Sequence, residues 1–191
     1  MAKIAALIPI KHHSERVEGK NYRDFAGQPL YRHILRSLSD AQLVDQIVVN
    51  TDSDRIREDC GSSFPDVTLL PRPDRLCGGD VPTNALIEHD LEHIEADYYL
   101  QTHATNPLLA SATIDRSITT LLENQASFDS LFSVTRRNQR FWDALSRPVN
   151  HNPNILLRTQ DLPPFYEENS CIYLFSLSLI HISEPTRLRL I

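Results

Sequence analysis

Short apolar runs alternate along the chain with segments in which apolar residues recur at helical spacing. The apolar runs have the length and composition of buried strands and lie at residues 5–8, 46–50, 67–70, 98–102 and 130–134. The intervening segments place apolar side chains on one face of a helix and lie at residues 31–38, through Ile56, at 87–94 and at 114–122. Strands that alternate with helices in this way predict a three-layer α/β/α fold with a mostly parallel, Rossmann-like sheet.

The alternation breaks down between residues 136 and 165. Four prolines fall in or beside this stretch, at Pro148, Pro153, Pro163 and Pro164. We expect an irregular insertion here, with an edge strand at residues 155–157. Insertions of this kind in α/β enzymes often cover an active site or pair two subunits, and the sequence leaves both roles open.

Composition narrows the class of protein. The chain has 191 residues, which suits one domain with a substantial core, and 41% of them are hydrophobic. Its net charge of −6 argues against a nucleic-acid partner, because such proteins carry a basic surface. The three cysteines form no C-x-x-C pair, and no apolar run is long enough for a signal core or a membrane span. We expect a cytoplasmic protein with no membrane partner.

The first apolar run leads directly into a cationic loop. Lys11, Arg16, Lys20 and Asn21 lie within eleven residues, and a helical pattern follows from Leu30. A buried strand, a cationic loop and a helix together form the arrangement with which α/β proteins hold phosphates at the carboxyl edge of a sheet. The alternative is an ordinary solvated loop that happens to be basic.

The residues of this stretch carry a family resemblance. Residues 8–21 read I-P-x-K-x-x-S-x-R-V-x-G-K-N, and residues 26–30 read A-G-x-P-L. Together they resemble the signature of the acylneuraminate cytidylyltransferases, the CMP-sialic acid synthetases. Further segments similar to that family lie at residues 72–84, 101–108, 158–163 and 168–173, so that the resemblance extends from residue 3 to about residue 175.

The resemblance implies a nucleotidyltransferase fold and a reaction. The anomeric oxygen of a nonulosonic acid attacks the α-phosphorus of CTP, and pyrophosphate leaves. Catalysis of this kind depends on positioning and on stabilising negative charge, so the resemblance also implies Mg²⁺ as a cofactor. The family's magnesium-binding aspartates belong to a later segment that this chain lacks, and we therefore predict no metal ligand. A homodimer is implied as well.

The resemblance also assigns site residues. It implies that Arg158 and Lys20 are catalytic. The nucleotide side would comprise Lys11, Arg16, Lys20, Asn21, Arg72, Thr83 and Asn84. The sugar side would comprise Gln101, His103, Gln160, Asn169 and Tyr173.

Three alternatives remain open. Related enzymes that activate 3-deoxy-manno-octulosonate begin with a similar motif. The chain departs from the family pattern at Lys11, Glu18, His103 and Ser170, which leaves room for a nucleotide-binding relative without catalysis. Residues 89–93 read H-x-x-E-H, a zinc-peptidase pattern that would place His89 and His93 on one helix face. Against zinc, the acidic neighbours Glu88, Asp90 and Glu95 are typical of a solvated helix face.

The end of the chain has a different character. The segment LSLIHISEPTR, at residues 177–187, resembles the translation of a transposon adapter used in preparing sequencing libraries. We therefore expect residues 1–175 to form a cytidylyltransferase domain that is incomplete at its C-terminus. Residues 176–191 would then be a non-native tail.

Overall fold

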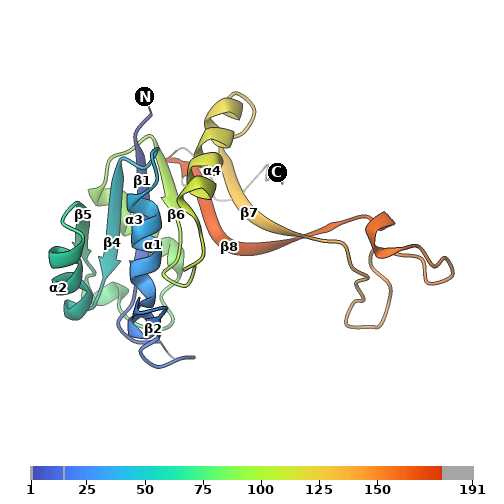
Figure 1. The fold of residues 1–191 in the computed structure, drawn as a ribbon, viewed down its shortest axis with the longest axis horizontal. Coiled ribbons are helices and arrows are strands. Elements are labelled where there is room, and N and C mark those ends of the chain that lie inside the picture. Colours follow the sequence, from blue (N-terminus) through green and yellow to red (C-terminus); the bar gives the residue numbers. More distant parts are fainter. Residues whose placement is uncertain (1, 15, 178–191) are drawn as a thin grey trace.

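A single mixed sheet organises the molecule. The computed structural model describes residues 2–14 and 16–177. Its six-stranded sheet has the order β5-β4-β1-β6-β8-β7 (Figure 1). The strands are β1 (Ile4–Ile10), β4 (Gln46–Thr51), β5 (Val67–Pro71), β6 (Tyr98–Gln101), β7 (Ser130–Arg137) and β8 (Phe165–Ser176). A separate two-stranded hairpin pairs β2 (Asp24–Phe25) with β3 (Gln28–Pro29).

The centre of the sheet is parallel, as the sequence predicts. β1 pairs with β4 on one side and with β6 on the other, and β4 pairs with β5, all in parallel register. β8 runs antiparallel to both β6 and β7. Because the parallel strands share one direction, the loops that follow β1, β4, β5 and β6 meet at the same edge of the sheet.

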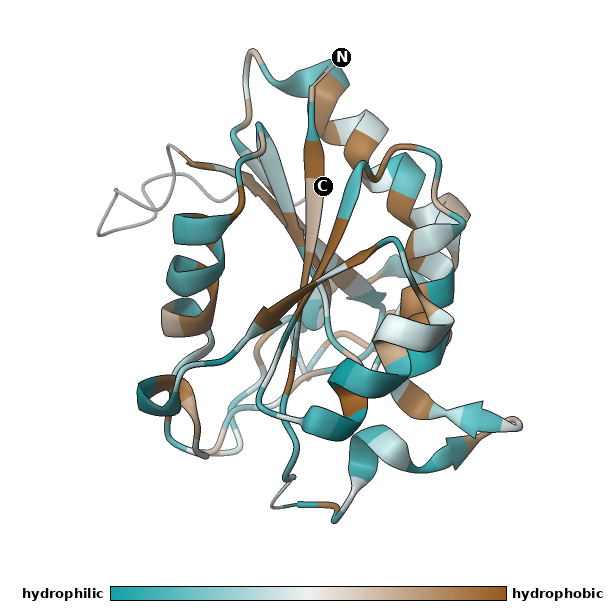
Figure 2. Ribbon diagram, turned by 90° about the vertical axis from the view of Figure 1, so that its left-hand side faces the viewer, coloured by the Kyte–Doolittle hydropathy of each residue, from teal (hydrophilic) through white to brown (hydrophobic). Residues whose placement is uncertain are grey.

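Helices cover both faces of this sheet and confirm the three-layer prediction. They are α1 (Leu30–Ser39), α2 (Asp54–Ser63), α3 (Thr83–His93) and α4 (Ser111–Asn124). Successive β1 side chains point to opposite faces: Ile8 packs with residues of α1, α2 and α4, whereas Leu7 packs with residues of α3. Figure 2 shows hydrophobic residues gathered in the central strands and mixed with hydrophilic ones in the helices.

The insertion forms a long extension of the sheet. The antiparallel pair of β7 and β8 continues away from the body, and residues 138–164 lie at its far end (Figure 1). The short helix η3 (Thr159–Asp161) belongs to this end. The predicted edge strand at residues 155–157 is wrong, because no regular strand forms there. Strand β8, for which the apolar pattern offered no prediction, pairs with β7 over most of its length instead.

Two further sequence expectations concern membrane helices and the end of the chain. In the described part of the chain, no helix combines the length and the hydropathy needed to cross a bilayer. Ser176, where the expected non-native tail begins, is the last residue of β8 and pairs with Tyr98. Residues 178–191 of that tail lie outside the described residues.

Candidate active site

A polar cavity of about 260 Å³ opens at the carboxyl edge of the parallel strands. Three loops form it: the cationic loop after β1, the segment between β5 and α3, and the loop after β6. Its lining residues are Pro9, Lys11, Ser14, Lys20, Asn21, Arg72, Leu76, Gly78, Gly79, Val81, Thr83, Leu86, His103, Ala104 and Thr105. We call this cavity the cationic pocket, and it contains most of the residues that the sequence assigns to the nucleotide.

Three positively charged side chains, those of Lys11, Arg16 and Lys20, lie close together at this pocket. The pKa of Lys20 is lowered first by burial and then by the like charges of Arg16 and Lys11. Arg16 is exposed and does not line the pocket, yet it lies close enough to affect Lys20. No ion pair between described residues involves any of the three. An anion in the pocket would relieve this mutual repulsion.

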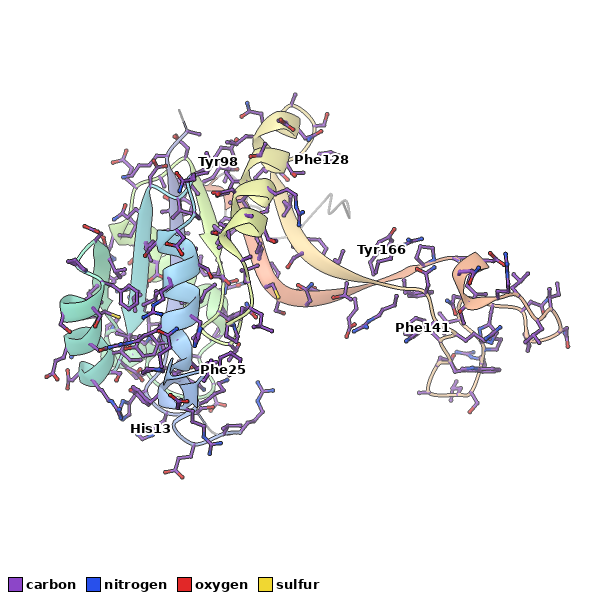
Figure 3. The ribbon with its side chains drawn as sticks, in the orientation of Figure 1. His13, Phe25, Tyr98, Phe128, Phe141 and Tyr166 are labelled. Carbon is purple, nitrogen blue, oxygen red and sulfur yellow. The ribbon has the colours of Figure 1, made fainter. Side chains whose placement is uncertain are left out.

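Local interactions hold the cationic loop in place. Asn21 is buried, and its side-chain amide donates a 2.9 Å hydrogen bond to the carbonyl of Lys11, which ties the two ends of the loop together. Gly19 has φ of 60°, a left-handed conformation that suits glycine, and it precedes the short helix η1 (Lys20–Tyr22). The backbone that carries Lys11 and Lys20 therefore has a defined conformation, held by this hydrogen bond and by η1. Figure 3 shows His13 and Phe25 at this end of the molecule.

Arg72 lines the same pocket. Its side chain is 8% exposed, and its Nε atom donates a 2.8 Å hydrogen bond to the Asn50 side chain. Burial lowers the pKa of Arg72, while the nearby charges of Asp52, Cys77 and Asp90 act in the opposite direction. Arg72 is thus a buried residue of the pocket wall and not an exposed arginine in a surface turn.

A second cavity, of about 490 Å³, adjoins the first. It is lined by Thr83, Asn84, Ile87, Gln101, His103, Ser170, Tyr173 and Phe175. Thr83 and His103 line both cavities, so the two form one continuous site. We call the second cavity the acceptor pocket. Asn84, assigned from sequence to the nucleotide, lies here instead of in the cationic pocket.

His103 stands at the junction of the two cavities. Gln101 is buried, and its side-chain nitrogen lies within 3.4 Å of both ring nitrogens of His103. Burial, followed by the charge of Lys20, lowers the pKa of His103. Both effects favour the neutral imidazole, which has one donor and one acceptor nitrogen.

Strand β8 supplies the far wall of the acceptor pocket. The hydroxyl of Tyr173 donates a hydrogen bond to Glu168, and it lies 3.1 Å from the hydroxyl oxygen of Ser170. Ser170 has φ of 54°, in the left-handed region that glycine adopts without strain. This backbone conformation gives a physical reason for the glycine that is usual at this position in the family resembled.

Besides Arg16, three residues assigned from sequence line neither cavity. Asn169 lines neither of them, and its Oδ1 atom accepts a 2.6 Å hydrogen bond from Ser133. Arg158 and Gln160 lie on the β7–β8 extension, where Arg158 is exposed and pairs with Asp161 over 2.6 Å. The site within one chain therefore brings together the residues of the sheet edge and not those of the extension (Figure 1).

The H-x-x-E-H string, at residues 89–93 of α3, does not form the zinc site that its pattern suggests among the described residues. The ring centroids of His89 and His93 lie 4.5 Å apart with the ring planes tilted by 38°, and Asp90, expected on a solvated face, is fully buried. Among residues 2–14 and 16–177, no group of three or more His, Cys, Asp or Glu side chains could hold a metal ion. That part of the chain lacks the third ligand that a zinc peptidase requires.

Comparison with known proteins places this site in a family context. A family model described as Cytidylyltransferase matches residues 5–187. A 3-deoxy-manno-octulosonate cytidylyltransferase of Geobacter sulfurreducens is 32% identical over 123 residues, or 64% of this chain and 47% of that protein. N-acylneuraminate cytidylyltransferase A of Danio rerio is 26% identical over 184 residues, or 93% of this chain and 42% of that protein. The chain thus spans about half the length of these curated relatives.

A solved structure shares the fold. The structure of CMP:2-keto-3-deoxy-manno-octonic acid synthetase complexed with CTP matches with a TM-score of 0.70 at 14% identity. The match covers 94% of this chain and 76% of that one. This likeness confirms the α/β nucleotidyltransferase fold that the sequence predicts.

Proposed function

Because the chain belongs to the cytidylyltransferase family, we propose that it transfers CMP from CTP to a nonulosonic acid of the sialic type and releases pyrophosphate. One observation carries this proposal. A pocket lined by Lys11 and Lys20, with Arg16 close enough to repel Lys20, adjoins a second pocket, and the two share Thr83 and His103. The first suits a triphosphate, and the second suits an acceptor held beside it.

The reaction exchanges one P–O bond for another and releases one proton. The anomeric hydroxyl oxygen of the sugar acid attacks the α-phosphorus, the bond to the β-phosphate oxygen breaks, and the hydroxyl proton leaves. Negative charge grows on the departing pyrophosphate, and catalysis consists mainly of positioning and of stabilising that charge. Lys20 and Lys11 line the cavity where this charge would develop, and Arg16 adds to the local positive potential.

The acceptor pocket supports the choice of a polar sugar acid. Gln101, His103 and Tyr173 supply hydrogen-bonding groups, while Ile87 and Phe175 supply an apolar wall. The named relatives act on N-acylneuraminate in one case and on 3-deoxy-manno-octulosonate in another. We favour the nonulosonic acid because the match to the N-acylneuraminate enzyme extends over 93% of this chain. The octulosonate is the alternative substrate.

We also propose that the enzyme is a homodimer formed through the β7–β8 extension. Its far end exposes a set of large apolar side chains that water would otherwise surround: Trp142, Leu145, Val149, Ile155, Leu156 and Leu157. Arg158 and Gln160 lie on the same extension, away from the pocket of their own chain (Figure 1). In such a dimer, the extension would carry these two residues to the pocket of the other copy.

The described pocket residues do not form a magnesium site. Mg²⁺ prefers carboxylate and phosphate oxygens, and the cationic pocket is lined by no Asp or Glu among the residues described. Our proposal of Mg²⁺ therefore rests on the family alone, and the ion would be needed for the charge of CTP. Three free cysteines, with Cys60 buried, support our further proposal of a cytoplasmic location.

The test is a pyrophosphate-release assay with CTP and two acceptors, N-acetylneuraminate and 3-deoxy-manno-octulosonate, each with and without Mg²⁺. We expect release with CTP and the nine-carbon acid, and little with ATP, GTP or UTP. Release with the octulosonate alone would select the alternative substrate. Binding of CTP with no release for either acid would instead favour the non-catalytic relative.

A further inference from the structure

A buried polar network lies directly behind the cationic pocket. Arg72 is fixed at three points: its backbone N–H donates to the Thr51 carbonyl over 3.1 Å, its Nε to Asn50 Oδ1 over 2.8 Å, and one terminal nitrogen to the Asn50 carbonyl over 3.0 Å. Asn50 is the residue before the last of β4 and is completely buried. Asn50 therefore holds the Nε–H and one terminal N–H of the Arg72 guanidinium. The remaining N–H groups of Arg72 are left for the pocket, which Arg72 lines.

Asn50 is in turn held by an acid on α3. Its side-chain nitrogen donates to Asp90 Oδ1 over 2.5 Å, and Asp90 is completely buried. The direction of these bonds matters. An amide that donates to Asp90 must present its oxygen to Arg72, whereas the flipped amide would set an N–H against the N–H of Arg72. The carboxylate therefore selects the one amide orientation that can hold the guanidinium.

The second oxygen of Asp90 has no protein partner. Asp90 Oδ2 is buried and receives no hydrogen bond in the described residues, although His89 Nδ1 lies 3.6 Å from the other oxygen. A fold that needed only packing here would be served by an apolar residue. A buried carboxylate with an unsatisfied oxygen is a cost that calls for a compensating role.

We propose that Asp90 is a positioning residue, which acts through Asn50 to hold Arg72 in the orientation that binds the nucleotide. The inference rests on the proposed function for the identity of the ligand, CTP. It concerns a residue that touches neither cavity and that belongs to the H-x-x-E-H string. The chain Asp90–Asn50–Arg72 links α3 to the floor of the pocket through two successive hydrogen bonds.

The pKa of Asp90 provides a way to separate positioning from stability. Burial raises this pKa, and the contacts with Asn50, His89 and Arg72 only partly offset that effect. A carboxyl whose pKa is higher in the folded state favours folding at low pH and loses that contribution as pH rises. At pH 7.5 the charge of Asp90 should therefore add little to stability, so Asp90→Asn, which removes the charge and keeps an acceptor for Asn50, should leave the melting temperature close to that of the native protein.

The experiment is a double-mutant cycle read by calorimetric titration of CTP. In the native background, Asp90→Leu should weaken CTP binding about tenfold, because it leaves the Asn50 amide nitrogen with only its 3.5 Å contact to His89 Nδ1 and lets the amide flip. Asp90→Asn keeps an acceptor and should lose less. In an Arg72→Ala background, Asp90→Leu should change CTP affinity less than about twofold. Asp115→Ala, which removes a carboxylate that caps the backbone of Gln42 and Leu43, is the control for general destabilisation.

A readout without CTP keeps the two proposals distinguishable. The NMR signal of the Arg72 Nε–H, identified by its absence in Arg72→Ala, should exchange slowly with water in the native protein and rapidly in Asp90→Leu. An equal loss of CTP affinity in both backgrounds would overturn the positioning role, as would an unchanged Nε–H signal. If the native protein fails to bind CTP while the signal responds as stated, the proposed function fails and the link from Asp90 to Arg72 stands.

Discussion

The cationic pocket and the β7–β8 extension differ in how their polar and apolar groups meet solvent. At the pocket, polar side chains such as Asn21, Asn50 and Arg72 are buried and held by defined hydrogen bonds. On the extension, Leu156 is 90% exposed and Arg158 lies in solvent beside Asp161. The pocket is therefore organised within one chain, whereas the extension exposes the apolar surface through which we propose that a second copy binds.

This difference indicates which site residues one chain can bring together and which it cannot. Side chains that follow parallel strands converge because the strands share a direction, so one chain suffices to build the cationic pocket. Residues of the extension depart from that edge with β7 and β8 (Figure 1). We therefore expect changes at the pocket to act on nucleotide binding and changes at the extension to act on assembly.

The largest effect should come from the pocket. Lys20→Met keeps the length of the side chain and removes its charge, so the growing negative charge of pyrophosphate loses a stabilising partner. We expect kcat/KM for CTP to fall about a hundredfold. Arg23→Met, at an exposed cation three residues further along, is the matched control and should stay near the native value. Similar losses of kcat/KM in both variants would show that the effect comes from general surface charge and not from the position of Lys20 in the pocket.

The second effect sharpens the role of the extension. Leu156→Asp places a charge within the exposed apolar set, and we expect the dimer dissociation constant to rise at least about tenfold. Leu108→Asp is the control, because Leu108 is 84% exposed on the body of the molecule and should not alter assembly. Sedimentation velocity over a range of concentrations measures both. A native protein that stays monomeric would remove the proposed interface.

A smaller effect contrasts two carboxylates, one on the body of the molecule and one on the extension. Asp115 accepts hydrogen bonds from the backbone N–H groups of Gln42 and Leu43, at 3.1 Å and 3.0 Å. Asp115→Ala should lower the free energy of unfolding by about 1–3 kcal/mol, since those donors lose a charged partner. Asp161→Ala removes only a solvent-exposed ion pair and should cost less than about 0.5 kcal/mol. Urea denaturation compares them, and equal costs would contradict the contrast.

The smallest effect is a pH dependence confined to the pocket. Burial and the charge of Lys20 lower the pKa of His103, so the folded protein resists protonating it. The unfolded chain takes up that proton near the ordinary pKa of 6.5, and stability is therefore lost as pH falls from about 6.5 through the folded value. His103→Gln should flatten this part of the curve of urea midpoint against pH. An unchanged curve would show that His103 is not the group responsible.

The strands and helices of the body could be predicted because their apolar positions repeat at the period of each element. β8 could not, since the residues from Glu167 to Ser170 are polar and exposed, so neither face of that part of the strand has a hydrophobic pattern. The opposite error occurred at residues 155–157. That run is apolar, but it has no neighbouring strand to pair with and lies exposed.

The residues of the site also fall into those that the sequence could predict and those that it could not. Motifs that end parallel strands identified Lys11, Lys20 and Arg72, because sheet topology alone brings such positions together. Asp90 escaped prediction, since its acidic neighbours on α3 are typical of a solvated face and only the packing of α3 against β4 reveals its burial. For Arg158, the sequence named a residue without indicating that the extension separates it from its own pocket.

The most direct test of the account is a calorimetric comparison of CTP with CMP on the native protein and on Lys20→Met. If the cationic pocket holds the β- and γ-phosphates, the native protein should bind CTP at least about tenfold more tightly than CMP. That preference should largely disappear in Lys20→Met. Equal affinity of the native protein for the two nucleotides would contradict the central claim that these cations exist to hold a triphosphate.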